Sequence, residues 1–160
     1  MALVLVAIKR YPVKAKNILR RPSYATTMVN DLCEANGYSN VKEINLCVKV
    51  HGEPLNWTDA RNVCLVERAD LFIANTIGTY EYLKDIIHQS GSVWIGARYF
   101  EEDCIWRWVD GNILNITTLF NLGISLIKTT NDADCLQFTQ RMFHGINCDK
   151  KQRFICQRKI

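Results

Sequence analysis

The chain has 160 residues, of which 48% are hydrophobic and 22% charged, which is typical of one globular domain and excludes a disordered chain. The formal net charge is +4, but six basic residues precede Asp31, the first acid, and the remainder holds 14 basic and 16 acidic residues, so nucleic acid is not an expected partner. No apolar run reaches the ~18 residues of a membrane span, and none is expected in this chain.

Residues 1–8 are apolar and are followed at once by Lys9 and Arg10, which reverses the charge order of a secretory signal peptide. Residues 9–30 are basic, free of acids and contain Ser and Thr, as in a mitochondrial transit peptide. The seven cysteines favour an oxidising compartment instead. We therefore interpret residues 1–32 as a basic, poorly ordered or atypical start, and predict one domain over residues 33–160.

The first half of this domain predicts strands and two helices. Residues 44–50 alternate between turn signals at 37–38 and 51–54, which indicates a strand hairpin. Asn56 can cap a helix, after which apolar residues recur at helical spacing, namely Trp57, Ala60, Val63 and Cys64. Residues 71–73 indicate a short buried strand. A second amphipathic helix contains Tyr82, Leu83, Ile86 and Ile87, and ends at Ser90-Gly91.

After Gly91 the pattern changes to short strands, at residues 93–96 and 106–109, with a turn at 110–112. Residues 111–131 show no clear period and are predicted to be a long loop, which is uncommon in a compact domain unless it is functional. Closing strands are expected at the two remaining apolar stretches, Cys135 to Phe138 and Arg153 to Cys156. Helices followed by short strands predict an α+β fold.

The cysteines indicate a disulfide framework with one cysteine left over. A cytosolic metal site would need close pairs of cysteines or histidines. None is present, and the three histidines, His51, His88 and His144, are scattered. No metal site and no cofactor are therefore predicted, and an extracellular or secreted protein is expected.

Three segments together resemble C-type lectin-like domains. Residues 57–64 resemble the family's first helix. Residues 94–97, Trp-Ile-Gly-Ala, resemble its central strand, and residues 106–111, Trp-Arg-Trp-Val-Asp-Gly, resemble the element that follows. The spacing of Cys135, Cys148 and Cys156 resembles the family's closing pattern. The resemblance runs from Cys33 to the C-terminus and implies this fold in its long form, stapled by disulfides.

The resemblance also implies a pairing, Cys33–Cys47, Cys64–Cys156 and Cys135–Cys148. The second bridge would close a loop of about 93 residues, which corresponds to roughly 4–5 kcal/mol in the chain-entropy model. Cys104 remains, either as a buried inert thiol or as an interchain disulfide that links a dimer. A catalytic thiol is not expected, because nothing in the sequence places a base beside Cys104.

Calcium-dependent sugar-binding members of the family carry EPN or QPD in the long loop and WND before the penultimate cysteine. The corresponding positions here are 125–127, Ser-Leu-Ile, and 143–145, Phe-His-Gly, which offer few oxygen ligands. Calcium is therefore not expected at the standard site. The remaining candidates for ligand contacts are Asn131, Asp132, Asp134 and His144, with a solvated loop as the alternative.

Two further features leave alternatives open. Apolar residues recur over 119–127, where the loop either folds back onto its own core or presents a protein-binding face. Glycosylation sequons begin at Asn56 and Asn115, and Asn115 is the better candidate because it lies in the predicted loop.

The resemblance implies a non-catalytic recognition module, of a family that serves innate recognition and adhesion. It would bind a carbohydrate or protein ligand without the standard calcium site. The alternative is a protein-binding receptor ectodomain or secreted antagonist with no sugar binding. An enzyme is not expected, because no Ser-His-Asp set, carboxylate pair, metal-ligand cluster or phosphate-binding Gly loop can be assembled from the sequence.

Overall fold

The computed structural model describes residues 33–34, 36–128, 130–139 and 142–160, so the predicted N-terminal segment 1–32 lies outside the described residues. Nine strands form one sheet: β1 Ser39–Val41, β2 Leu46–Leu55, β3 Asp70–Leu71, β4 Val93–Phe100, β5 Ile105–Trp108, β6 Leu126–Lys128, β7 Cys135–Thr139, β8 Met142–Ile146 and β9 Gln152–Lys159. The helices are α2 Trp57–Val66, α3 Ile77–Ser90 and α4 Ile116–Asn121. This α+β arrangement is the predicted fold class. None of the helices in these ranges combines the length and apolar character that a membrane span requires.

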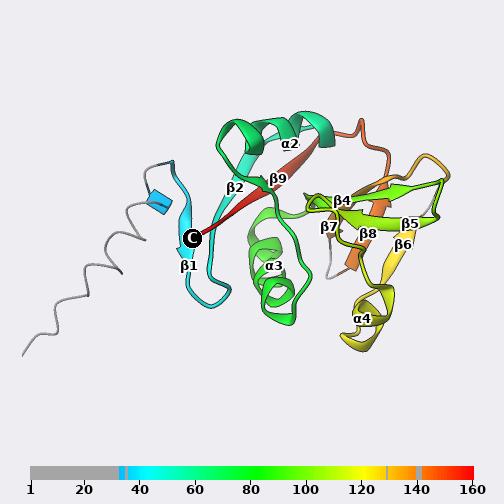
Figure 1. Ribbon diagram of the computed structural model, residues 1–160. Coiled ribbons are helices and arrows are strands. Elements are labelled where there is room, and N and C mark those ends of the chain that lie inside the picture. The colour runs from blue at the N-terminus through cyan, green and yellow to red at the C-terminus, as the bar shows by residue number, and fades with distance from the viewer. Residues whose placement is uncertain (1–32, 35, 129, 140–141) are drawn as a thin grey trace, which may run out of the picture.

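The sheet has the order β1-β2-β9-β4-β7-β8-β6, with β3 paired to β9 and β5 paired to β4 (Figure 1). The last strand, β9, therefore lies between β2 and β4. It runs antiparallel to β2 and parallel to β4. A second parallel pair, β6 with β8, forms the far edge of the sheet.

The two longer helices lie on opposite sides of the sheet (Figure 1). Helix α2 begins at the predicted cap, where Asn56 Oδ1 accepts a hydrogen bond from the Asp59 backbone N–H at 2.8 Å. Its residues Trp57, Ala60 and Cys64 are buried, as their helical spacing predicts. Helix α3 buries Tyr80 and Leu83 against the other face.

Successive side chains of the central strands point to opposite faces of the sheet, so each face has its own hydrophobic core. Trp94 and Phe154 pack on the side of α2, whereas Ile95 joins the cluster on the side of α3. Trp94, Ile95, Trp108 and Phe154, which lie on strands that the sequence predicts, are each at most 4% exposed.

Gly96 is required by close packing in the centre of the sheet. A Cβ atom there would lie 2.7 Å from the Leu71 carbonyl O and 2.8 Å from Val109 Cγ2. The Gly96 N–H donates to the Phe72 carbonyl O, and the Gly96 carbonyl accepts from the Val109 N–H, both at 2.8 Å. The glycine of the Trp-Ile-Gly segment thus lets β4 approach its neighbours on both flanks.

The structure contains three disulfides: Cys33–Cys47, Cys64–Cys156 and Cys135–Cys148. They are the pairs that the resemblance implies. Cys64–Cys156 ties α2 to β9 through the core, and both residues are fully buried. Cys104 is a free thiol and is exposed, so the expectation of a buried, inert thiol is wrong.

The structure differs from the prediction at one turn, residues 51–54, and in one loop, residues 111–131. Strand β2 continues through the expected turn at 51–54, because its pairing with β9 extends to Leu55. An irregularity between His51 and Leu55 accommodates Gly52 and Pro54. The hairpin turn lies instead at residues 42–45, where Asn45 adopts φ 54°.

The predicted loop at 111–131 contains α4 and β6. Asn115 caps α4 through a hydrogen bond from the Thr118 N–H at 3.1 Å, and a helix of six residues is too short to show a helical period. Leu119 and Ile124 are buried, so the segment does fold back onto the core, whereas Phe120 is 80% exposed.

Candidate ligand-binding surface

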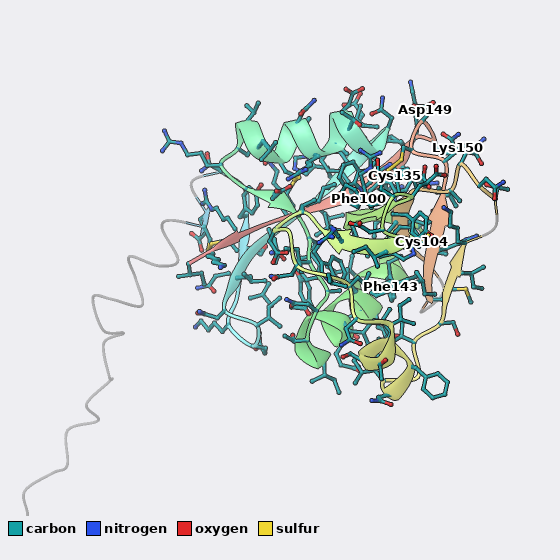
Figure 2. The ribbon with its side chains drawn as sticks, turned by 45° about the vertical axis from the view of Figure 1, so that its right-hand side comes forward. Phe100, Cys104, Cys135, Phe143, Asp149 and Lys150 are labelled. Atoms are coloured by element: carbon teal, nitrogen blue, oxygen red, sulfur yellow. A yellow bond between two sulfur atoms is a disulfide. The ribbon has the colours of Figure 1, made fainter. Side chains whose placement is uncertain are left out.

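The two segments that would hold calcium in the family's sugar-binding members pair with each other as the parallel strands β6 and β8. Leu126 lies opposite Phe143, Ile127 opposite His144, and Lys128 opposite Gly145. Phe143 is fully buried and contacts the ring of Trp108 edge-on at 6.2 Å (Figure 2). The pairing brings together apolar side chains and one histidine, where a calcium site needs several oxygen ligands.

Gly145 has no room for a side chain. A Cβ atom at this position would lie 2.8 Å from the Ala133 carbonyl O and 2.9 Å from the Trp106 ring. Trp106 is itself 4% exposed, so the ring cannot simply turn away. A carboxylate at position 145 would therefore displace either the backbone or a core aromatic residue.

Gln137 and His144 face each other across β7 and β8, with Gln137 Nε2 3.4 Å from His144 Nδ1. Gln137 is 7% exposed, and its Oε1 atom, like His144 Nε2, is buried without a hydrogen-bond partner in the described part of the chain. Buried polar atoms are normally satisfied, so these two atoms need a partner that the described residues do not supply, such as a bound water molecule. Ile127, 41% exposed, lies on the other side of His144 in the register.

The acidic loop before β7 divides into two separate groups. Asp132 Oδ1 accepts from the Thr130 hydroxyl at 2.5 Å, and Asp132 Oδ2 accepts from Asn147 Nδ2 at 2.8 Å. The Thr130 hydrogen bond, followed by that from Asn147, lowers the pKa of Asp132 below its ordinary value. Asn131 is exposed in the same turn.

Asp134 belongs to the second group. Its Oδ1 atom accepts from Lys128 Nζ at 3.0 Å, and the ammonium also lies 3.6 Å from the centre of the Tyr99 ring. The negative charge of the Asp134 carboxylate is therefore already balanced by Lys128. The four residues predicted as ligand contacts thus belong to three groups: Asn131 with Asp132, Asp134 with Lys128, and His144 with Gln137.

One group of potential metal ligands occurs in the described ranges, namely His51, Glu67 and Cys156. The sulfur of Cys156 is bound to Cys64, which leaves only two donors. His51 Nε2 lies 3.3 Å from Glu67 Oε2, and its ring stacks on Phe154 at 4.4 Å. Burial lowers the pKa of His51 more than the nearby Glu67 raises it, so the imidazole is neutral and packs as an aromatic ring.

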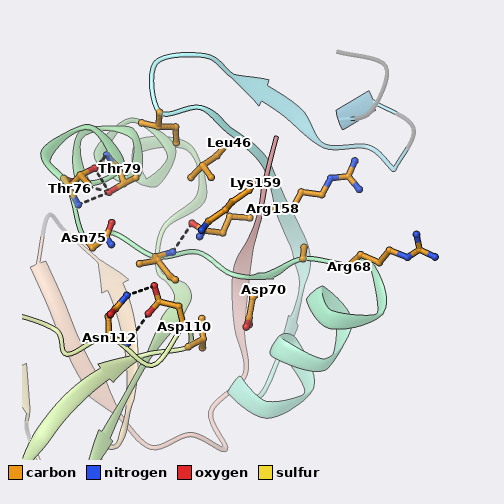
Figure 3. A pocket seen from close by; sticks show the side chains of 15 residues that line it. Leu46, Arg68, Asp70, Asn75, Thr76, Thr79, Asp110, Asn112, Arg158 and Lys159 are labelled. Carbon is orange, nitrogen blue, oxygen red and sulfur yellow. Dashed lines mark hydrogen bonds between the residues drawn. The ribbon is translucent and has the colours of Figure 1, made fainter. Parts of the chain in front are cut away.

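A larger cleft of about 580 Å³ lies between β9, α3 and the turn after β5 (Figure 3). Its polar groups largely serve local structure. Thr76 and Thr79 exchange hydrogen bonds at the start of α3, and the Asp110 carboxylate accepts from the Asn112 N–H and amide at 3.0 and 2.9 Å. Asp110 is therefore a turn residue.

Cys104 lies in the turn between β4 and β5 with φ 54° (Figure 2). Its thiol donates to the Glu101 carbonyl O at 3.5 Å. A hydrogen bond with Cys104 is the main cause that raises the pKa of Tyr99. Next to Cys104, a shallow groove of about 380 Å³ is lined by Ile105, Ile113 and Ile116.

The two sequons differ in what their side-chain amides do. Asn56 Nδ2 donates to Asp59 Oδ2 at 2.7 Å, so this amide is engaged in the helix cap. Asn115 is exposed and uses only its Oδ1 atom for capping, which leaves its Nδ2 atom without a partner in the described structure.

Sequence reasoning missed Gln137, Asn147 and Lys128. Gln137 had a signal, because it is the only strongly polar residue in the expected strand Cys135 to Phe138. Asn147 and Lys128 could not be found in this way, since their roles depend on which strands become neighbours.

Comparison with known proteins gives a consistent result. The family model described as "Lectin C-type domain" matches residues 53–158. Mouse CD209 antigen-like protein D is 28% identical over 105 residues, which is 64% of this chain and 44% of that protein. Mouse killer cell lectin-like receptor subfamily B member 1F is 24% identical over 117 residues, 72% of this chain and 52% of that protein. The chain thus spans about half the length of these curated relatives.

Among solved structures, the trimeric Kupffer cell C-type lectin receptor Clec4f has a TM-score of 0.65 at 20% identity, covering 85% of this chain and 91% of that chain. A calcium-independent type II antifreeze protein has a TM-score of 0.59 at 19% identity, covering 77% of this chain and 92% of that chain. At these identities the likeness concerns the fold.

Proposed function

Because this chain belongs to the lectin C-type domain family, we propose that it is an extracellular recognition module that binds a glycan or a protein without calcium at the family's usual position. Members of the family are generally non-catalytic recognition proteins whose lectin domains lie outside the cell. We propose the same here, with secretion as the route, since three disulfides require an oxidising compartment.

The observation that carries the proposal is the packing around Gly145. The resemblance aligns this glycine with the aspartate of the WND segment, but Trp106 and the Ala133 carbonyl occupy the space that its side chain would need. Phe143 is in the core, and Asp134 is already paired with Lys128. Type II antifreeze proteins with this fold include both a Ca2+-dependent and a calcium-independent one, so the proposal rests on the packing around Gly145 and not on the fold.

Calcium titration is expected to give an apparent Kd that is millimolar or weaker, or no binding, by calorimetry. Gly145→Asp is expected not to restore binding, and to reduce the free energy of unfolding by about 2–4 kcal/mol through overpacking and a buried carboxylate. Asp132→Ala is the control that removes an acid without disturbing the core. Micromolar calcium binding that Asp132→Ala or Asp134→Ala abolishes would contradict the proposal.

For the ligand, we propose the surface around Gln137, His144 and Ile127, where two buried polar atoms have no partner in the described structure. A glycan array probed with and without a chelator tests this assignment. Signals that survive the chelator and weaken in His144→Ala support it. If the signals vanished with the chelator, glycan binding would depend on calcium and the proposal would be wrong.

The exposed apolar residues around α4 favour a second candidate, a protein-binding receptor ectodomain or secreted antagonist. Phe120, Ile113 and Ile116 are 80%, 58% and 57% exposed. Such residues on one segment are a common feature of protein contacts. A silent glycan array, together with binding to a receptor ectodomain that Phe120→Asp abolishes, would favour this candidate over glycan recognition.

In secreted protein, Asn115 is expected to carry a glycan more fully than Asn56, because the amide of Asn56 is engaged with Asp59. Intact mass of Asn115→Gln and Asn56→Gln proteins measures this directly, since each variant loses the mass of its own glycan. Equal losses in the two variants would contradict the expectation.

The same spectra, taken without reductant, test the proposal that the exposed Cys104 links two chains, with Cys104→Ser as control.

A further inference from the structure

We propose that the groove between α2 and the β4–β5 hairpin is a binding site for a sulfated glycan, held by a pair of arginines, Arg98 and Arg107. The groove has a volume of about 180 Å³, and its lining includes Trp57, Arg61, Arg98, Phe100, Arg107 and Gly111. It shares no residue with the surface around Gln137 and His144, so this proposal does not depend on where the module binds its other ligand.

The two arginines lie directly opposite each other on adjacent antiparallel strands, β4 and β5. Like charges in such a pair repel and destabilise the sheet slightly. Arg107 Nη2 is 2.8 Å from Asp103 Oδ2, which balances its charge at an exposed turn. Arg98 is exposed and has no ion pair within the ranges that the structure describes. The hairpin thus presents the Arg98 guanidinium, which has no ionic partner among the described residues, beside that of Arg107, which is paired with Asp103.

The rest of the groove is built around this pair. Arg98 lies over the Trp57 ring at 5.6 Å, and Arg61 lies over the same ring at 5.8 Å. Arg61 is held in place by both oxygens of Asp70, each at 3.0 Å. Its charge is therefore balanced, and its main effect is to fix the wall of the groove. Among the described residues, the Arg98 side chain lies over the Trp57 ring and makes no hydrogen bond or ion pair, so its N–H groups remain available.

An apolar surface adjoins the two guanidinium groups. The ring of Phe100 is 41% exposed and lies 5.9 Å from the Arg107 guanidinium (Figure 2). At the rim, a Cβ atom on Gly111 would meet nothing within 4 Å, so that side is open. A sugar ring has apolar C–H faces as well as polar groups, and it can pack on Phe100 while a substituent reaches the arginines.

Sulfate fits the arginine pair better than a neutral hydroxyl group does. A guanidinium donates two parallel N–H hydrogen bonds to an oxyanion, and such charge-assisted bonds are stronger than neutral ones. A sulfate bound at Arg98 and next to Arg107 would also supply the counter-charge that Arg98 lacks, since Asp103 pairs with Arg107 alone. The combination of two guanidiniums with an exposed ring therefore favours a sulfated sugar over a neutral glycan.

Calorimetry of the full chain with a heparin oligosaccharide at physiological salt tests the proposal. Arg98→Gln is expected to weaken binding by about tenfold, and Arg98→Gln with Arg107→Gln by more, since each loses charge-assisted hydrogen bonds. Lys42→Gln, which removes one exposed charge from the β1–β2 turn at the other end of the sheet, is expected to change Kd by less than about twofold.

The melting temperature separates binding from folding. Arg98→Gln is expected to melt at the wild-type temperature or slightly above it, because it removes a like-charge contact. Equal weakening by Arg98→Gln and Lys42→Gln would overturn the proposal, because binding would then follow net charge alone. Polyglutamate that binds as tightly as heparin, and depends equally on Arg98, would overturn the assignment to a sugar. A chelator-sensitive glycan array would contradict the calcium-independent function but leave these heparin results unaffected.

Discussion

Replacing Trp94 by Ala is expected to lower the free energy of unfolding by about 3–5 kcal/mol. Trp94 is fully buried in the cluster on the side of α2, and its Nε1–H donates to the Leu55 carbonyl O at 2.9 Å. The substitution would open a cavity between the central strands and also leave that carbonyl without its donor. Such a loss is a large part of the stability of an ordinary domain.

Denaturant unfolding measures this effect. Far-UV circular dichroism is the suitable probe, because its signal comes mainly from the backbone, whereas tryptophan fluorescence would itself change in the variant. Phe120→Ala is the matched control, because it also removes an aromatic ring, but from a residue that is 80% exposed. The control is expected to stay within about 0.5 kcal/mol of the wild type. If the unfolding curve of Trp94→Ala had the same midpoint and slope as that of the wild type, the burial of Trp94 would not contribute to stability and the prediction would be wrong.

Removing the Cys64–Cys156 bridge, by Cys64→Ala with Cys156→Ala, is expected to cost roughly 4–5 kcal/mol, since the bridge closes a loop of about 93 residues. In the chain-entropy model, the gain comes from restricting the unfolded chain. The bridge between Cys135 and Cys148 spans a sequence separation of only 13, and the same model gives it about 3 kcal/mol. The ranking of the two double variants is therefore part of the prediction.

Both double variants replace each sulfur atom by hydrogen, at buried positions except for the partly buried Cys148, so both leave small cavities. Cys104→Ser controls for the loss of a thiol outside any intrachain bridge. Thermal and denaturant unfolding of the three proteins give the comparison. If removal of the short bridge destabilised the domain more than removal of the long one, native-state strain or residual structure would outweigh loop entropy here.

The parts of the fold that could be predicted from sequence carry strong local signals. Helix α2 has a cap at Asn56 and a regular apolar face, β4 is a run of mostly apolar residues, and β9 has an apolar centre at residues 154–156. Strands β6 and β8 lack such signals. Leu126–Lys128 is three residues long, and Met142–Ile146 contains a glycine and a histidine. Strand β8 is stabilised by pairing with β7 on one side and β6 on the other, and β6 by its pairing with β8, which is a contact between segments far apart in the sequence.

The candidate surface could be predicted only in part for the same reason. His144 was identified from its position before Cys148, but its buried neighbour Gln137 becomes visible only once β7 and β8 are in register. The opposition of Arg98 and Arg107 likewise depends on the register of the hairpin around residues 101–104. Single residue types in sequence do not specify which pairs face each other across strands.

The position of β9 has a consequence for how the protein is made in the cell. Its residues 152–159 fill the gap between β2 and β4, so neither of those strands has its inner partner until this segment has left the ribosome. During synthesis the nascent chain therefore presents two open strand edges and a Cys64 thiol whose partner does not yet exist, while Cys104 has already emerged. The sheet is therefore completed, and Cys64 meets its partner, only after all the other strands have been made, and until then the thiols of Cys64 and Cys104 are both open to exchange with oxidoreductases.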